Sequence, residues 1–295
     1  APPALALLPA AALRRRKSAP DSPAPRPSNV VKVQRLNAPS SEKDIYDGFY
    51  NGQPCVVAVA KEGNRSIRRE AETLRRLQSC PHINQLIAFE EGNGEQCMIL
   101  QRVEPLGHDL VEVTLQQQHS GRPMPLGQMR HYLLQLARAC EEMRSHGVVH
   151  RDLQAANVLI DRDHSVKVID FGVATVACDS APDGQVWHAV HVTNEYSAPE
   201  VNVTPGSPSI DVWGLGIVLY SLCFAINPCR AQILLSAESP SGVCGRLHDM
   251  EGTHPSAAEA IEGLLRERPE DRWGLDDVLR WAAQAEVPAS IGGGA

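Results

Sequence analysis

The spacing of apolar residues changes near residue 104, and this change limits the fold more than any other feature. Before it, short runs rich in β-branched residues, such as C-V-V-A-V-A-K at 55–61, indicate strands. After it, apolar residues recur at helical spacing, as in the stripe from Met129 to Met143 that ends before Gly147. A small sheet-rich part followed by a larger helical part predicts an α+β fold with two lobes.

The sheet-rich part contains four expected strands and one helix. The strands are V-V-K-V-Q-R-L from Val30, the run at 55–61, Q-L-I-A-F at 85–89 and C-M-I-L-Q-R-V at 97–103. Between the second and third strands, apolar residues at helical spacing predict a helix with Ser66 as its N-cap.

The helical part begins with the stripe at 129–143. A small hairpin is expected around Arg162–His164, and residues 210–224 are apolar nearly all round, which indicates a helix buried on every side. Ser256 and Glu259 have the spacing of a capping box, and L-D-D-V-L-R-W at 275–281 closes the last helix.

Composition narrows the functional class. The 295 residues are 43% apolar and 21% charged, as in a folded globular domain, and the net charge of −7 argues against nucleic-acid binding. The eight cysteines include no C-x-x-C pair, which indicates reduced thiols in the cytoplasm rather than a disulfide framework or a zinc site. No apolar run is long enough to span a membrane.

Both ends of the chain are expected to be tails. Residues 1–29 are rich in Ala, Pro and Ser and predict a disordered segment, and 286–295 predict a flexible one. The apolar stretch at 4–13 precedes the basic run at 14–17, an order that is wrong for a signal peptide, and the chain does not begin with Met. We interpret the basic run as part of a solvated tail, with a localisation signal or docking patch as the alternative.

Six short motifs occur in a fixed order. They are A-V-A-K at 58–61, H-R-D-L-Q-A-A-N at 150–157, D-F-G at 170–172, A-P-E at 198–200, D-V-W-G-L-G at 211–216 and P-E-D-R at 269–272. Together they resemble the motif set of the protein kinase family. The resemblance covers about residues 30–285 and implies the bilobal protein kinase fold, with an N-lobe at about 30–104 and a C-lobe at about 105–285.

The resemblance implies a catalytic apparatus that uses ATP and Mg²⁺. Asp152 would be the catalytic base, Asn157 and Asp170 would hold the metal, and Lys61 would bind the α/β-phosphates. Glu70 is the expected partner of Lys61, because it lies four residues before Leu74 and shares the core-facing side of its helix. The residues expected to bind the nucleotide are Lys61, Val59, Phe49, Leu100, Gln101, Val103 and Leu159.

Supporting positions also match the family. Its apolar column between the lobes corresponds to Leu74, Leu86, His150 and Phe171. Asp211 matches the aspartate that anchors the catalytic loop. Glu200 and Arg272 match an ion pair in the helical lobe.

The chain departs from the family pattern in the small lobe. The family's glycine-rich loop aligns with E-K-D-I-Y-D-G-F at 42–49, which places Glu42, Asp44 and Asp47 at the glycine positions. Gly48 and Gly52 lie nearby, so a glycine-containing loop in a shifted register is an alternative. Val59 stands where an alanine usually packs on adenine, and the first helix is expected to be short. In the catalytic loop, Gln154 replaces a usual lysine.

The expected acceptors are Ser and Thr of protein substrates. V-T-N-E-Y-S-A-P-E at 192–200 resembles the serine/threonine form of this segment, and it outweighs the hint of tyrosine specificity in D-L-Q-A-A-N. Phosphorylation of Thr175, Ser180 or Thr193 would order the activation segment at 173–192 by pairing with Arg151. A regulatory partner is compatible with this reading.

Two other functions compete with an active protein kinase. A pseudokinase that acts as a scaffold or allosteric partner is suggested by the acidic residues at 42–47. A small-molecule kinase is disfavoured, because such enzymes lack the A-P-E segment and the D-V-W-G helix. The expected site of action is the cytoplasm, or that of a host cell if the protein is a delivered effector.

Overall fold

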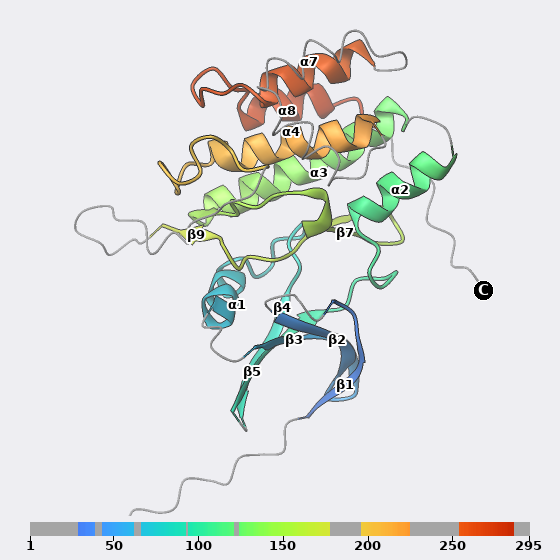
Figure 1. Ribbon diagram of the computed structural model, residues 1–295, viewed down its shortest axis with the longest axis vertical. Coiled ribbons are helices and arrows are strands. Elements are labelled where there is room, and N and C mark those ends of the chain that lie inside the picture. The colour runs from blue at the N-terminus through green and yellow to red at the C-terminus, as the bar shows by residue number, and fades with distance from the viewer. Residues whose placement is uncertain are drawn as a thin grey trace, which may run out of the picture.

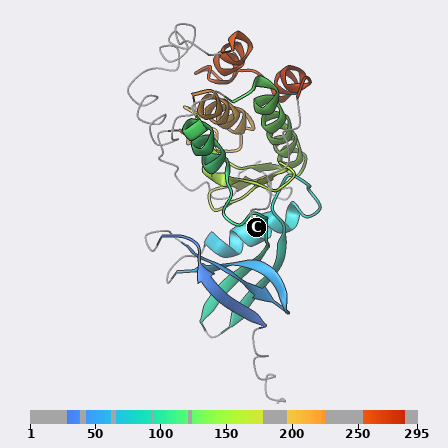
Figure 2. The same ribbon diagram turned by 90° about the vertical axis from the view of Figure 1, so that its right-hand side faces the viewer.

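The computed structural model describes residues 29–38, 43–61, 66–92, 94–120, 124–177, 196–224 and 254–285. Figures 1 and 2 show the sheet at one end of the molecule and most of the helices at the other. The expected two-lobed α+β arrangement is therefore confirmed. Of the two expected tails, 1–29 and 286–295, all residues except Asn29 lie outside the described residues.

The N-lobe is built on one antiparallel sheet with the strand order β1-β2-β3-β5-β4. Its strands are β1 (Val30–Arg35), β2 (Lys43–Tyr50), β3 (Gln53–Ala60), β4 (Leu86–Gly92) and β5 (Glu95–Gln101). Helix α1 (Ser66–Arg76) packs beside β4 and β5 (Figure 1). Ser66, the expected N-cap, is the first residue of this helix.

Side chains of β3 alternate between two environments. Cys55, Val57 and Val59 belong to a small apolar cluster of the N-lobe, together with Cys97 and Ile99 of β5. Ala58 belongs instead to the main core, which continues into the C-lobe. Because successive side chains of a strand point to opposite faces, this division fixes which face each residue of β3 presents.

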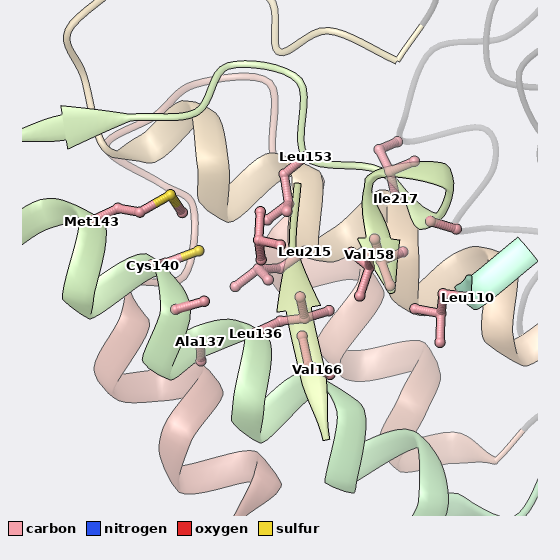
Figure 3. Close-up of a cluster of buried hydrophobic side chains, with 14 of the residues drawn as sticks. Leu110, Leu136, Ala137, Cys140, Met143, Leu153, Val158, Val166, Leu215 and Ile217 are labelled. Carbon is pink, nitrogen blue, oxygen red and sulfur yellow. The ribbon is translucent and has the colours of Figure 1, made fainter. Parts of the chain in front are cut away.

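The C-lobe consists mainly of helices around a buried core. Those in the described ranges are α2 (Leu110–Ser120), α3 (Leu126–Ser145), α4 (Ser209–Phe224), α7 (Pro255–Leu264) and α8 (Leu275–Ala282). The expected stripe on α3 is buried throughout. Figure 3 shows Leu136 of α3 and Leu215 of α4 in one cluster with Leu153 of the catalytic loop motif and Val158, which follows the motif. None of the described helices is long and apolar enough to cross a membrane.

Short strands connect this core to the site. β6 (Val148–Val149) pairs with β9 (Thr175–Val176), and β7 (Val158–Ile160) pairs with β8 (Val166–Val168). The second pair is the hairpin expected around Arg162–His164, and His164 closes it at a φ of 59°.

The expected capping box at the start of α7 is wrong. Residue His254 is the N-cap and makes no side-chain capping bond, since the helix begins one residue before Ser256, at Pro255. The Ser256 hydroxyl accepts hydrogen bonds from Arg130 (3.2 Å) and Trp281 (2.9 Å). Ser256 therefore ties α7 to α3 and α8.

Candidate active site

The catalytic loop follows β6 and is held from α4. Both carboxylate oxygens of the buried Asp211 accept backbone N–H bonds at 2.9 Å, one from His150 and one from Arg151. The backbone of Arg151 is left-handed, with a φ of 69°, and its guanidinium donates to the carbonyls of Val173 and Val201 (both 3.1 Å). The expected anchoring role of Asp211 is therefore confirmed.

Two carboxamides orient the Asp152 carboxylate. Gln154 Nε2 donates to both of its oxygens at 3.1 Å, and Asn157 Nδ2 donates to Oδ2 at 3.0 Å. Asn157 also donates to the backbone carbonyl of Asp152 at 2.8 Å, and Asn157 is the last residue of a 3-10 turn at Ala155–Asn157. Gln154 thus supplies a hydrogen bond where the family usually has a charge.

The D-F-G segment lies beside this loop. The Phe171 ring is buried and meets the His150 ring edge-on, with 4.8 Å between centroids. Leu74 and Leu86 are buried as well, so all four residues of the expected column are buried. Asp170 follows with a φ of 63°.

Lys43 forms a buried ion pair with Glu70 and a more exposed one with Asp170, and the second pair links the two lobes at the site. Lys43 Nζ of β2 lies 2.7 Å from Glu70 Oε2 and 2.9 Å from Asp170 Oδ1. Burial raises the pKa of Glu70, and the charge of Lys43 only partly opposes this. Burial also acts to raise the pKa of Asp170, but the charge and hydrogen bond of Lys43 prevail and lower it. For Lys43 burial acts to lower the pKa, and the two carboxylates raise it overall.

The expected ion pair between Lys61 and Glu70 is wrong. Lys61 follows the end of β3, and its Nζ lies 3.6 Å from Asp44 Oδ1. The cause is strand parity: Val56 and Ala58 line the cavity, so the next residue on that face is Ala60 and not Lys61. V-A-V-A at 57–60 therefore occupies the place of the family's V-A-x-K, with alanine in the position of the lysine.

One cavity of about 770 Å³ contains the site. Of the expected catalytic and metal-binding residues, it is lined by Asp152, Asn157, Asp170 and Glu70. Of the expected nucleotide-binding residues, it is lined by Leu100, Gln101, Val103 and Leu159. The sequence analysis missed several lining residues, among them Lys43, Leu36, Asn37, Ile45, Ala58 and Met98.

Val59 and Phe49, like Lys61, were expected to bind the nucleotide, but they do not line the cavity. Val59 is buried in the separate N-lobe cluster, and Phe49 is 38% exposed on β2 opposite Pro54. The cavity is lined by Ala58 and not by Val59, so an alanine does stand at the position where Val59 was expected. The even spacing of Val56, Ala58 and Ala60 was the signal that could have revealed this.

The alignment of the glycine-rich loop with 42–49 is also wrong. Lys43–Tyr50 is strand β2, and the connection between β1 and β2 spans residues 36–42. Asp44 pairs with Arg35 (2.6 Å), and Asp47 pairs with Arg102 (3.2 Å). Glu42 lies outside the described residues.

The helical lobe holds the expected Glu200–Arg272 pair. The Arg272 guanidinium is buried and lies 2.5 Å from Glu200 Oε1 and 3.1 Å from Oε2. Of the three hydroxyls considered for phosphorylation, that of Thr175 is buried and donates to Pro205 O at 2.8 Å. Ser180 and Thr193 lie outside the described residues.

Within the described ranges, no group of three or more His, Cys, Asp or Glu side chains could hold a metal ion. Asn157 and Asp170 nevertheless offer two oxygen ligands on one cavity. This number suits Mg²⁺, which takes few protein ligands and completes its shell with water and phosphate oxygens.

Comparison with known proteins gives concordant matches. The family model of the protein kinase domain matches residues 56–282. The PAS domain-containing serine/threonine-protein kinase of Mus musculus is 31% identical over 155 residues, which are 51% of this chain and 10% of that protein. Serine/threonine-protein kinase TIO of Arabidopsis thaliana is 28% identical over 258 residues, 83% of this chain and 18% of that protein. Serine/threonine-protein kinase PLK1 of Xenopus laevis is 32% identical over 152 residues, 51% of this chain and 25% of that protein. The chain thus spans a quarter or less of the length of these relatives.

Proposed function

Because the chain belongs to the protein kinase family, we propose that it transfers the γ-phosphoryl group of ATP to Ser and Thr hydroxyls of protein substrates. One observation carries the proposal: Asp152, Asn157 and Asp170 line a single cavity between the lobes. The serine/threonine kinases among the relatives support the acceptor class, as does the A-P-E segment.

Asp152 would accept the proton of the substrate hydroxyl. As that oxygen bonds to the γ-phosphorus, the bond from phosphorus to the leaving ADP oxygen breaks and the proton moves to the carboxylate. Gln154 and Asn157 hold the carboxylate for this task through their hydrogen bonds.

Asn157 and Asp170 would hold Mg²⁺. The hydrogen bonds of the Asn157 side chain use its Nδ2, which leaves the amide oxygen as a ligand. Those of the Asp170 side chain use Oδ1, which leaves Oδ2 as a ligand. The metal would supply positive charge to the phosphate oxygens. The family generally uses this cofactor with ATP.

A scaffold without turnover is the alternative. It was suggested by three carboxylates in the phosphate-binding loop, but Asp44 and Asp47 belong to β2 and pair with Arg35 and Arg102. The feature that favoured the scaffold is thereby reduced to Glu42.

Phosphoproteomics of a protein extract treated with the purified chain and ATP tests the proposal. We expect new phosphoserine and phosphothreonine, and a loss of about 100-fold or more in rate for Asp152→Asn. Asp163→Asn, on the exposed hairpin turn, is the matched control and should leave the rate unchanged. Binding of MgATP without any transfer would favour the scaffold, and phosphotyrosine alone would contradict the acceptor class.

A further inference from the structure

We propose that Lys43 of β2, and not Lys61 after β3, is the lysine that binds the nucleotide phosphates. This inference rests on the proposed kinase function and adds a residue to it. It assigns the task to a different strand from the one that the sequence motif indicates.

The register of the sheet explains how the lysine can change strands. Lys43 and Ala60 are direct partners across the β2–β3 ladder. Partners in an antiparallel pair project from the same face, with their Cβ atoms about 5 Å apart. A long side chain from position 43 can therefore reach the space that a lysine at position 60 would enter. Ala60 itself fills little of that space.

The contacts of Lys43 fit the task. Its side chain is 13% exposed and lines the cavity, with Nζ between Glu70 and Asp170. An ammonium group has three N–H donors, and these two carboxylates account for two of them. The third is available to a phosphate oxygen in the cavity.

The strand around Lys43 is held on both faces. The Asn37 carboxamide donates to the carbonyl of Lys43 (2.5 Å) and accepts the N–H of Ile45 (2.9 Å). Asp44, between them, projects to the other face and is bound by Arg35 at 2.6 Å. Lys61 lies 3.6 Å from the same Asp44 oxygen. Lys61 thus has a supporting position on the face away from the site.

Three variants test the assignment. Lys43→Met removes the ammonium group but keeps much of the side-chain bulk, and Lys61→Met is the matched control. The third variant adds Ala60→Lys to Lys43→Met, which returns a lysine to the same face from β3. MgADP binding is followed by fluorescence titration and by the rise in Tm, and transfer is followed with the substrates found by phosphoproteomics.

We expect Lys43→Met to weaken MgADP binding and to lower phosphoryl transfer about 100-fold. Lys61→Met should stay within about threefold of the wild type in both, because a partly exposed ion pair contributes little. The Lys43→Met/Ala60→Lys variant should transfer the phosphoryl group at least about tenfold faster than Lys43→Met, since the restored amine can again stabilise the phosphoryl charge. The Tm of Lys43→Met, measured without nucleotide, shows that this variant folds.

Other results would overturn the assignment. If Lys61→Met loses MgADP binding and transfer while Lys43→Met keeps them, the phosphate lysine is Lys61. If both single variants bind and transfer normally, neither lysine has the role. A wild type that transfers nothing would count against the proposed kinase function, and the comparison of MgADP binding between the two variants would still decide the lysine.

Discussion

The catalytic loop and the N-lobe sheet place their site residues by different physical means. In the loop, Asp152 and Asn157 lie five residues apart on a segment whose backbone is bound by the buried Asp211. In the sheet, Lys43 reaches Glu70 because alternation and register turn it toward the cavity. A strand that shifts by one residue reverses the face of every side chain. The positions in the sheet are therefore more sensitive to small changes in the chain than those in the loop.

The largest loss of stability is expected at the buried Arg272–Glu200 ion pair of the helical lobe. Arg272→Met leaves the Glu200 carboxylate without its buried partner and should lower the free energy of unfolding by about 3–5 kcal/mol. Lys32→Ala is the matched change in the sheet, because Lys32 and Glu95 are 31% and 56% exposed, and it should cost less than about 1 kcal/mol. Urea denaturation measures both. Equal losses of stability in the two variants would contradict the expectation that the buried pair contributes more than the exposed one.

The pH dependence of the Arg272 variant provides a check. Burial acts to raise the pKa of Glu200, but the hydrogen bonds of Arg272 and its other partners lower it overall. A carboxyl with a lower pKa in the folded state contributes stability above its unfolded pKa and loses it as pH falls through the folded pKa. The difference between wild type and Arg272→Met should therefore shrink in acid. A difference that grows below about pH 4 would contradict the pairing.

The anchor of the catalytic loop should give the next largest effect. Asp211→Asn keeps one acceptor oxygen, so one of the buried N–H groups of His150 and Arg151 loses its partner. The expected loss is about 2 kcal/mol of unfolding free energy. Hydrogen exchange at these two amides measures the local effect. Unchanged exchange at both amides would show that the loop does not depend on Asp211.

The sheet can be tested at a glycine of β2. A Cβ at Gly48 would meet the carbonyl oxygen of Val31 at 2.2 Å, so Gly48→Ala must displace β1. We expect a loss of about 1–3 kcal/mol in unfolding free energy. Gly92→Ala in β4 meets nothing within 4 Å and should stay within about 0.5 kcal/mol. Thermal and urea unfolding measure the stability of both variants. Equal stabilities would mean that β1 can move away from β2 at little cost in free energy.

The smallest effect is expected at Gln154. Gln154→Ala removes the hydrogen bonds to Asp152, while those of Asn157 remain. The kcat of transfer should fall by about tenfold or less, with the KM for ATP unchanged, because one carboxamide orients the base without binding the nucleotide. Steady-state kinetics measures both constants. A fall beyond about 100-fold would give Gln154 a larger role than positioning.

The sequence by itself determined the α+β fold, the bilobal arrangement and the catalytic loop. These follow from local patterns: helical stripes such as 129–143 bury one face, and H-R-D-L-Q-A-A-N keeps its site residues within one short segment. It also placed Glu70 correctly on the inner face of α1, because helical spacing from Leu74 settles that face.

Only the tertiary structure decided which lysine faces the cavity, which residues replace Val59 and Phe49 there, and where β2 begins. These depend on the pairing of β2 with β3, which sets Lys43 opposite Ala60 and turns Lys61 toward Asp44. A strand motif specifies residue types, but the face that each one presents is settled by register with a neighbouring strand. One residue of difference moves a lysine from the site to the opposite surface of the sheet.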